Sequence, residues 1–249
     1  MFGKIIGTGS YVPKEIVTNK DLAQYLDTDD TWIRERTGVK SRHISGDKET
    51  TADMAVKAAE KALENSGLLP DEIDLIIVSS VSSNLVLPST ACFVQKAINA
   101  KNAFCFDINV ACTGFITAYN ISQTFINTGL INTALVIGAE SLSKITDWSD
   151  RKTCILFGDG AGAVVIKKDE NAMFETVMFS NGKNGDALTM ENPFALRKTN
   201  LGKNHQGQFD ISFQDVHKTY INMDGGEIFK FAVKKVKLIS IFCIRQIAE

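Results

Sequence analysis

One cysteine stands where a protein could use it as a nucleophile. Cys112 occurs in FDINVACTGF, residues 106–115, between an apolar run typical of a strand and a segment typical of a helix. The positive end of a helix dipole and the unpaired N–H groups beside it favour the thiolate, which is the nucleophilic form. The position by itself leaves two interpretations open: a reactive thiol, or a small buried cysteine at a tight turn.

The remaining cysteines and the histidines give weaker signals. Four cysteines lie inside apolar helix or strand patterns: Cys92, Cys105, Cys154 and Cys243. We expect these four to be buried, as small apolar side chains usually are. The three histidines stand in no catalytic motif: His43, His205 and His217. We expect each histidine to be a solvated surface side chain.

Strands and helices alternate along residues 1–168 and could position the cysteine. Strands are predicted for IDLIIVSSV, AFCFDINV, TALVIGAE and GAGAVVIKK, and KIIGTGSYVP predicts a strand followed by a Gly-rich turn. Helices are predicted for TTADMAVKAAEKALENSG, PSTACFVQKAINA and TGFITAYNISQTFINTG. This alternation indicates an α/β fold, and IDLIIVSSV, apolar almost throughout, suits a central strand of a parallel sheet. The ends of such strands are where α/β sheets place their sites.

The pattern changes after residue 168. FETVMFSNG could begin a second α/β unit, and residues 180–222 are rich in Asn, Gly, Lys and Gln. GGEIFKFAVKKVKLISIF predicts one more helix. We therefore expect two parts: residues 1–168, which carry the nucleophilic cysteine, and residues 169–249, a partial second half.

Composition narrows the class of protein. The net charge of −2 gives no global reason to expect nucleic acid or an acidic membrane as a partner. No apolar run approaches the roughly 20 residues that cross a bilayer. Five cysteines without CxxC or a cysteine–histidine cluster argue against a disulfide framework and a metal site. A protein of the reducing cytoplasm fits this usage best.

Five segments together resemble the β-ketoacyl-ACP synthase III family of thiolase-fold condensing enzymes (ACP, acyl carrier protein). They are WIRERTGVKSRHI, LPSTACFVQ, DINVACTGF, GAESLSKITDWSDRKTCILFGDGAGAVV and EIFKFAV. The resemblance implies a thiolase-like α/β fold, with two similar halves stacked as α-β-α-β-α layers. It also implies condensation of acyl-CoA with malonyl-ACP to start type II fatty-acid synthesis, with no cofactor beyond these substrates.

The resemblance further implies roles for individual residues. Cys112 matches the nucleophile, and Trp32 and Arg151 match the pair that stacks on the adenine of CoA. Other CoA-contacting positions are matched by Thr28, Arg36 and Thr37, and pocket-lining positions by Leu156, Met223 and Phe229. Leu87 matches the residue that the partner of a homodimer inserts into the acyl pocket. Because many relatives carry a bulky aromatic there, the acyl-chain preference stays open. Lys230 and Lys234 are expected to contact the carrier protein.

The sequence departs from the family near its C-terminus. The family uses a cysteine, a histidine and an asparagine, and no histidine or asparagine up to Glu249 stands in a matching motif. We therefore expect an incomplete C-terminal half, and condensation impaired more than acyl loading, because oxyanion donors would be missing.

Two other classes stay open. One is a non-catalytic protein that binds acyl-CoA or ACP, or one chain of a split enzyme. The other is a nucleotide-dependent oxidoreductase, which depends on GDGAGA, a GxGxxA pattern. This motif precedes a predicted strand and does not open a helix, so we expect a tight glycine turn there instead.

Overall fold

The computed structural model describes residues 1–192, 199–203, 209–213 and 219–235, with side chains described for 1–192 and 219–235. The chain divides into two compact units. Unit 1 consists of Met1–Lys144 and Ile155–Thr176, and unit 2 of Ile145–Cys154 and Val177–Glu249.

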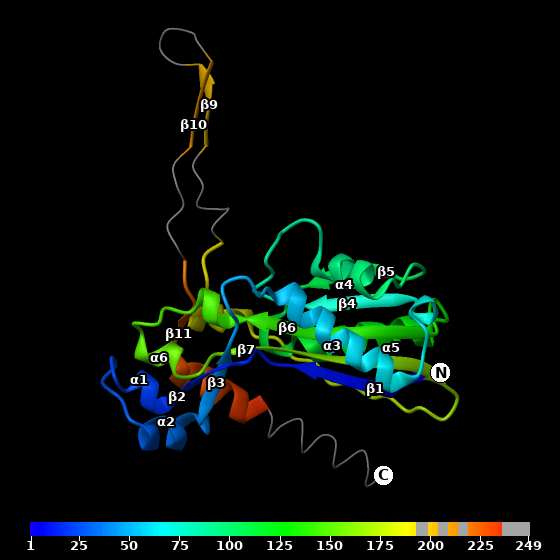
Figure 1. Ribbon diagram of the computed structural model, residues 1–249, viewed down its shortest axis with the longest axis horizontal. Helices are drawn as coiled ribbons and strands as arrows, with labels where there is room; N and C mark the ends of the chain where they lie inside the picture. Colours follow the sequence, from blue (N-terminus) through cyan, green and yellow to red (C-terminus); the bar gives the residue numbers. More distant parts are fainter. Residues whose placement is uncertain (193–198, 204–208, 214–218, 236–249) are drawn as a thin grey trace. The chain divides into compact units, whose positions relative to one another are not determined.

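Unit 1 is built on a five-stranded sheet with the strand order β1-β7-β6-β4-β5 (Figure 1). The strands are β1 (Phe2–Tyr11), β4 (Leu75–Ser79), β5 (Phe104–Ile108), β6 (Thr133–Ser141) and β7 (Asp159–Asp169). β4 runs parallel to β5 and to β6, which confirms the prediction of a central parallel strand. β7 pairs antiparallel with β1 and β6. The carboxyl ends of β4, β5 and β6 therefore share one edge of the sheet.

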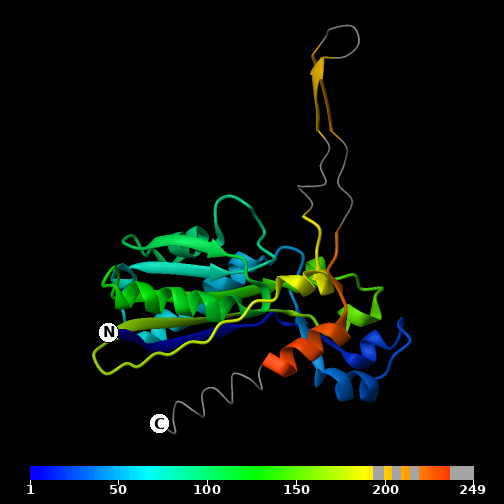
Figure 2. The same ribbon diagram turned by 180° about the vertical axis from the view of Figure 1, so that it is seen from behind.

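Helices cover both faces of this sheet. α3 (Thr51–Ser66) and α4 (Thr90–Ile98) pack on one face, and α5 (Gly114–Asn127) packs on the other (Figures 1 and 2). Thr50 and Asp53 form a capping box at the start of α3, and Gly67 ends it with φ 69°. All three helices confirm the sequence prediction.

The period of two along a strand explains the apolar character of β4. Ile76 and Val78 point into the core under α3 and α4, whereas Leu75 and Ile77 point into the core under α5. These four side chains are fully buried. Because both faces of the strand are covered, the residues from Leu75 to Val78 are apolar on both faces.

Small elements complete unit 1. A two-stranded antiparallel ribbon joins β2 (Glu15–Thr18) to β3 (Ser41–Ile44), and the helices α1 (Asn19–Leu22) and α2 (Asp30–Thr37) lie between them in the chain. Short 3-10 turns are η1 (Pro70–Glu72) and η2 (Ala111–Thr113), and η3 (Leu142–Ile145) runs to the unit boundary.

The expected glycine turn at GDGAGA is wrong. Asp159 already begins β7, and Gly160 and Gly162 are paired strand residues opposite Glu140 and Gly138 of β6. Small residues are compatible with a strand where neighbouring structure comes close, and Gly160 has the backbone oxygen of Tyr11 nearby.

Unit 2 contains little regular structure in its described residues. It has α6 (Arg151–Cys154), the 3-10 segment η4 (Gly182–Ala187), and two antiparallel pairs. The pairs are β8 (Leu188–Thr189) with β11 (Asn222–Met223), and β9 (Thr199–Lys203) with β10 (Phe209–Phe213). Residues 225–235 are helical, which confirms the described part of the last predicted helix. FETVMFSNG does not begin an α/β unit, because residues 172–181 form neither helix nor strand.

Candidate active site

Cys112 lies in η2, the single turn that joins β5 to α5, and its side chain is exposed. The preceding residue, Ala111, has φ 46°, in the left-handed region. This conformation costs an L-residue about 1–2 kcal/mol, so the surrounding structure must hold the turn in place. The predicted position between a strand and a helix is confirmed, and the α-helix proper begins two residues later, at Gly114.

Two glycines let the first turn of α5 approach the sheet closely. A Cβ on the buried Gly114 would overlap the Oγ of Ser79, the last residue of β4. The side chain of Phe115 lies 3.5 Å from the Cβ position of Gly138 in β6. The amide of Ser80 donates to the carbonyl of Ile108 at 3.2 Å and ties the ends of β4 and β5 together. These contacts fix the turn that carries Cys112.

The other described cysteines are less accessible. Cys154 is buried, as expected, whereas Cys92 and Cys105 are half-buried. Burial raises the pKa of the Cys105 thiol to about 12, and the hydroxyl of Ser89 donates to the Cys92 sulfur at 3.1 Å. Cys243 lies outside the described residues. Among the described thiols, Cys112 is therefore the one most open to a substrate.

Helix α2 brings two of the predicted CoA-contacting residues together. The guanidinium of Arg36 lies 4.2 Å from the centre of the Trp32 ring and also donates to the Trp32 carbonyl at 3.4 Å. Asp29 caps the helix by accepting from the Trp32 amide at 2.8 Å. An indole with a cation on its face is a suitable platform for a nucleotide base. The hydroxyl of Thr37 donates to the Ile33 carbonyl within the helix at 2.8 Å.

Asn19 anchors this platform to the rest of unit 1. Its buried amide donates to Asp30 at 2.9 Å, at the start of α2, and to the Val39 carbonyl at 2.8 Å, beyond the end of α2. Its oxygen accepts from the buried Arg42 guanidinium at 2.8 Å. The hydrogen bond from Asn19 lowers the pKa of the Asp30 carboxyl. In the turn before α2, the Oγ1 of Thr28 is buried without a hydrogen-bond partner among the described residues.

The remaining predicted residues of unit 1 are apolar and partly exposed. Leu87 lies in the loop 81–89 after β4, with 83% of its surface exposed, beside the exposed Leu85 and Val86. Leu156 is 38% exposed. Exposed large apolar side chains that cluster in one loop are typical of a contact surface.

Five predicted residues belong to unit 2. They are Arg151, Met223, Phe229, Lys230 and Lys234. Arg151 begins α6 and is exposed, Met223 is half-buried in β11, and Phe229 is 68% exposed in the helix 225–235. The ammonium of Lys230 donates to Glu227 at 2.9 Å, which raises the pKa of Lys230, and Lys234 is exposed. The expected pairing of Arg151 with Trp32 stays a prediction.

Sequence reasoning missed the roles of three acidic residues in the motifs. The carboxylate of Asp159 is buried and accepts four hydrogen bonds from the amides and hydroxyls of Ser45 and Ser143, at 2.6–2.9 Å. Asp107 and Glu140 bind backbone amides in a similar way. Each acid interrupts a mainly apolar, strand-like segment of its motif, and that pattern is the signal that could have found them.

His43 differs from the expectation of a solvated side chain. It is half-buried, and its Nδ1 lies 2.6 Å from the carbonyl oxygen of Pro13, to which it donates. This contact joins β3 to the segment before β2. His205 and His217 lie outside the described residues.

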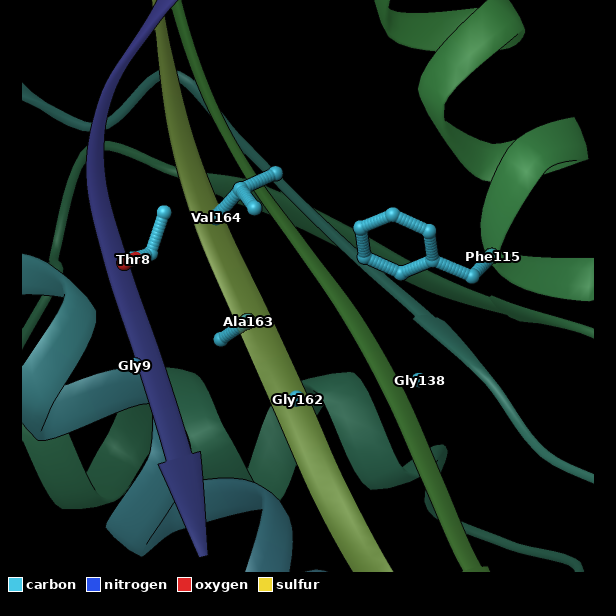
Figure 3. A pocket seen from close by; sticks show the side chains of 7 residues that line it. All are labelled: Thr8, Gly9, Phe115, Gly138, Gly162, Ala163 and Val164. Atoms are coloured by element: carbon cyan, nitrogen blue, oxygen red, sulfur yellow. The ribbon is translucent and has the colours of Figure 1, made fainter.

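An apolar hollow of about 440 Å³ lies on the α5 face of the sheet (Figure 3). It is lined by Thr8, Gly9, Phe115, Gly138, Gly162, Ala163 and Val164. In Figure 3 the ring of Phe115 extends from α5 toward the strands, near the glycines Gly138 and Gly162. The lining residues include no titratable group, so we do not place the chemistry there.

The described residues contain neither a candidate membrane span nor a metal-ligand cluster. Each described helix is too short or too polar to cross a bilayer. No group of three or more His, Cys, Asp or Glu side chains in the described part of the chain is arranged to hold a metal ion.

Known proteins are similar to this chain in sequence and in architecture. Residues 106–182 match the family described as 3-oxoacyl-[acyl-carrier-protein (ACP)] synthase III. The β-ketoacyl-[acyl-carrier-protein] synthase III of Clostridium acetobutylicum is 50% identical over 237 residues, which are 93% of this chain and 68% of that protein. The crystal structure of 3-oxoacyl-[acyl-carrier-protein] synthase III from Aquifex aeolicus is 41% identical, with a TM-score of 0.71 over 92% of this chain and 67% of that one. The priming β-ketosynthase of the R1128 polyketide pathway has a TM-score of 0.83 at 32% identity, over 94% of this chain and 67% of that one.

The α/β sheet, the cysteine turn at its carboxyl edge and these likenesses define a thiolase-like condensing enzyme. The chain belongs to the β-ketoacyl-ACP synthase III family, whose members are acyl-transferring ketosynthases. The predicted family and fold class are confirmed. The oxidoreductase alternative is wrong, because GDGAGA forms the start of strand β7 and opens no helix that could bind a pyrophosphate.

Proposed function

We propose that this chain is a β-ketoacyl-ACP synthase III that takes an acyl group from acyl-CoA onto Cys112 and condenses it with malonyl-ACP. The observation that carries the proposal is the exposed thiol of Cys112 on a turn with a left-handed residue before it, at the carboxyl edge of the parallel strands β4, β5 and β6. Family membership supplies the reaction type.

The chemistry has two steps. The thiolate of Cys112 attacks the thioester carbonyl of acyl-CoA, and the CoA thiolate leaves and takes up a proton. Malonyl-ACP then loses carbon dioxide, and the resulting enolate attacks the acyl-cysteine carbonyl. The cysteine thiolate leaves, and β-ketoacyl-ACP is the product. No cofactor beyond the two thioester substrates is proposed.

As the resemblance to the family implies, Trp32 and Arg151 would bind the adenine of CoA, and Arg36 would contact another part of CoA. The exposed guanidinium of Arg36 lies on the indole of Trp32, which supports a role for this face of α2 in binding a nucleotide. Thr28 and Thr37 would border the site. The buried Thr28 hydroxyl makes no hydrogen bond within the described part of the chain, which leaves it free for a ligand.

A second copy of the chain would complete the acyl pocket. Leu87, on the exposed apolar loop 81–89, would enter the pocket of its partner in a homodimer. Leu156, Met223 and Phe229 would line that pocket. The exposure of Leu87, Leu156 and Phe229 supports the assignment, because apolar surface of this kind is covered in a stable assembly.

The basic side of the helix 225–235 would receive the acidic carrier protein. Lys230 and Lys234 are exposed there, whereas the ammonium of Lys235 lies 4.6 Å from the centre of the Phe179 ring.

The four described cysteines are free thiols, which supports a place in the reducing cytoplasm.

Transfer of the acyl group to Cys112 tests the proposal directly. We expect incubation with acetyl-CoA to add one acetyl group, located on Cys112 by peptide mass mapping. Cys112→Ala should abolish the adduct, and Cys92→Ala, the matched control, should keep it. Binding of CoA without any adduct would favour the non-catalytic alternative over the enzyme.

A further inference from the structure

The loop 81–89 leaves the carboxyl end of β4 and leads into α4. Its tip is apolar: Leu85, Val86 and Leu87 are 47%, 67% and 83% exposed. Burial of such apolar side chains is favourable, so where the tip lies depends on what holds the loop. The hydrogen bonds at the two ends of the loop therefore decide how the tip is presented.

Glu140 holds the first end of the loop. Its carboxylate accepts from the amide of Val81, at 3.0 Å to Oε1 and 3.3 Å to Oε2, and from the hydroxyl of Ser82. The same hydroxyl oxygen accepts from the amide of Ser141 at 2.8 Å. The carbonyl of Ser82 accepts from the hydroxyl of Thr51 at 2.7 Å. The start of the loop is thus bound to β6 and to α3.

Asp107 holds the second end. Its two oxygens accept from the amides of Thr90, at 2.6 Å, and Ala91, at 2.8 Å, which are the first two residues of α4. Hydrogen bonds from backbone N–H groups at a helix start to a carboxylate are short and strong. The Ser89 side chain makes no capping hydrogen bond at this helix, so a strand residue supplies the cap.

The two carboxylates come from the two strands that flank β4. β6 carries Glu140 and β5 carries Asp107, both at the carboxyl edge from which the loop departs. Asp107 also belongs to the DINVAC segment that ends in Cys112. One strand therefore fixes both the nucleophile's turn and the far end of the loop.

We propose that Asp107 and Glu140 are positioning residues that hold the loop 81–89 at both ends and thereby set which acyl chains the enzyme accepts. The inference rests on the proposed function, because Leu87 acts on selectivity only if it enters an acyl pocket. A loop held at both ends presents Leu87 at a fixed depth, so the pocket accepts chains up to a defined length. If the loop is loosened, Leu87 no longer sets a defined maximum length for the acyl chain.

Asp107→Asn and Glu140→Gln test the proposal in the full chain. Asp74→Asn is the matched control, because Asp74 also accepts two amides, from Asn132 at 2.8 Å and Thr133 at 2.9 Å, but at the opposite edge of the sheet. Three quantities are measured. They are hydrogen exchange of loop amides, the ratio of Cys112 acylation rates from octanoyl-CoA and acetyl-CoA, and the iodoacetamide labelling rate of Cys112.

Both test variants should speed exchange of the loop amides about tenfold, which corresponds to about 1.4 kcal/mol. They should shift the octanoyl-to-acetyl ratio by at least about threefold and leave iodoacetamide labelling unchanged. The control should change neither loop exchange nor the ratio. Faster exchange with an unchanged ratio, or the same shift in the control, would overturn the selectivity role.

Two further variants guard against misfolding. Ser82→Ala removes a donor to Glu140 and leaves the carboxylate in place. Thr90→Pro removes a donor to Asp107 at the first position of α4, and the extended Ser89 (φ −61°, ψ 152°) accepts a following proline. A wild-type chain that cannot be acylated would contradict the proposed function and the selectivity role together. Loop exchange would still decide whether the carboxylates anchor the loop.

Discussion

Gly114 and Ser79 lie so close together that the first turn of α5 and the end of β4 leave no room for a Cβ between them. The contact joins the helix that follows the nucleophile to the central strand of the sheet. The position of the Cys112 turn is therefore set by the packing of a glycine as much as by the residues of the turn itself.

Gly114→Ala should displace this turn. Overpacking of this kind typically costs about 1–3 kcal/mol in unfolding free energy, because helix and strand must separate. Urea unfolding measures the loss, and Cys112 acylation should slow as well. Gly46→Ala is the control, since nothing lies within 4 Å of a Cβ there. Equal unfolding free energies for the Gly114 variant and wild type would contradict the close packing.

Cys112 should react first with a limiting alkylating agent. It is exposed, whereas Cys92 and Cys105 are half-buried, Cys154 is buried, and burial raises the pKa of Cys105 to about 12. Peptide mass mapping after brief treatment with iodoacetamide identifies the labelled thiol. Preferential labelling of Cys92 or Cys105 would show that the exposed turn is not the reactive position.

Trp32→Ala should weaken acyl-CoA binding about tenfold, the loss of one stacking partner. The iodoacetamide reactivity of Cys112 should stay the same, because the variant leaves the cysteine turn untouched. Isothermal titration with CoA gives the affinity. Glu35→Gln, an exposed position on the same helix, is the control. An unchanged affinity for Trp32→Ala would remove α2 from the CoA site.

Glu140 should make stability depend on pH in a defined direction. Burial, the largest influence, raises the pKa of Glu140 above its ordinary value of 4.5, against hydrogen bonds from Ser82, Val81 and Ser80 that lower it. A carboxyl group whose pKa is raised in the folded state stabilises the fold fully at pH values below its pKa in the unfolded chain. This stabilisation is lost as the pH rises through its pKa in the folded state.

Glu140→Gln removes that titration. The unfolding free energy of wild type, relative to the variant, should therefore fall as the pH rises above the ordinary pKa of 4.5. Urea unfolding at several pH values gives the difference. A difference that stays constant, or that grows with pH, would show that hydrogen bonding outweighs burial at Glu140.

Charge reversal at Lys230 and Lys234 should weaken binding of acyl carrier protein mainly through a slower association rate. The effect should shrink as salt screens the charges. Surface plasmon resonance at low and high salt measures both. Lys4→Glu on β1 changes the net charge as much as one of these two reversals does, so it is the control for each single-site variant. Unchanged association at low salt would make these lysines an ordinary solvated face.

The sequence by itself predicted the elements whose side-chain pattern is local. The pattern of TTADMAVKAAEKALENSG indicated α3, and the mainly apolar segment IDLIIVSSV indicated a strand covered on both faces. Cys112 was placed between its strand and its helix, and motif order indicated the family. These features depend on neighbours along the chain, so the chain alone determined them.

Tertiary structure decided the features that depend on distant partners. Asp159 lies more than a hundred positions from Ser45 in the sequence, yet its carboxylate binds that residue and makes GDGAGA the start of a strand rather than a turn. His43 donates a hydrogen bond to the carbonyl of Pro13, and no sequence motif predicts this contact. Asp107 caps a helix that precedes it in the chain. A buried carboxylate must satisfy its oxygens with whatever N–H groups the fold brings near, and only the packed sheet determines which ones those are.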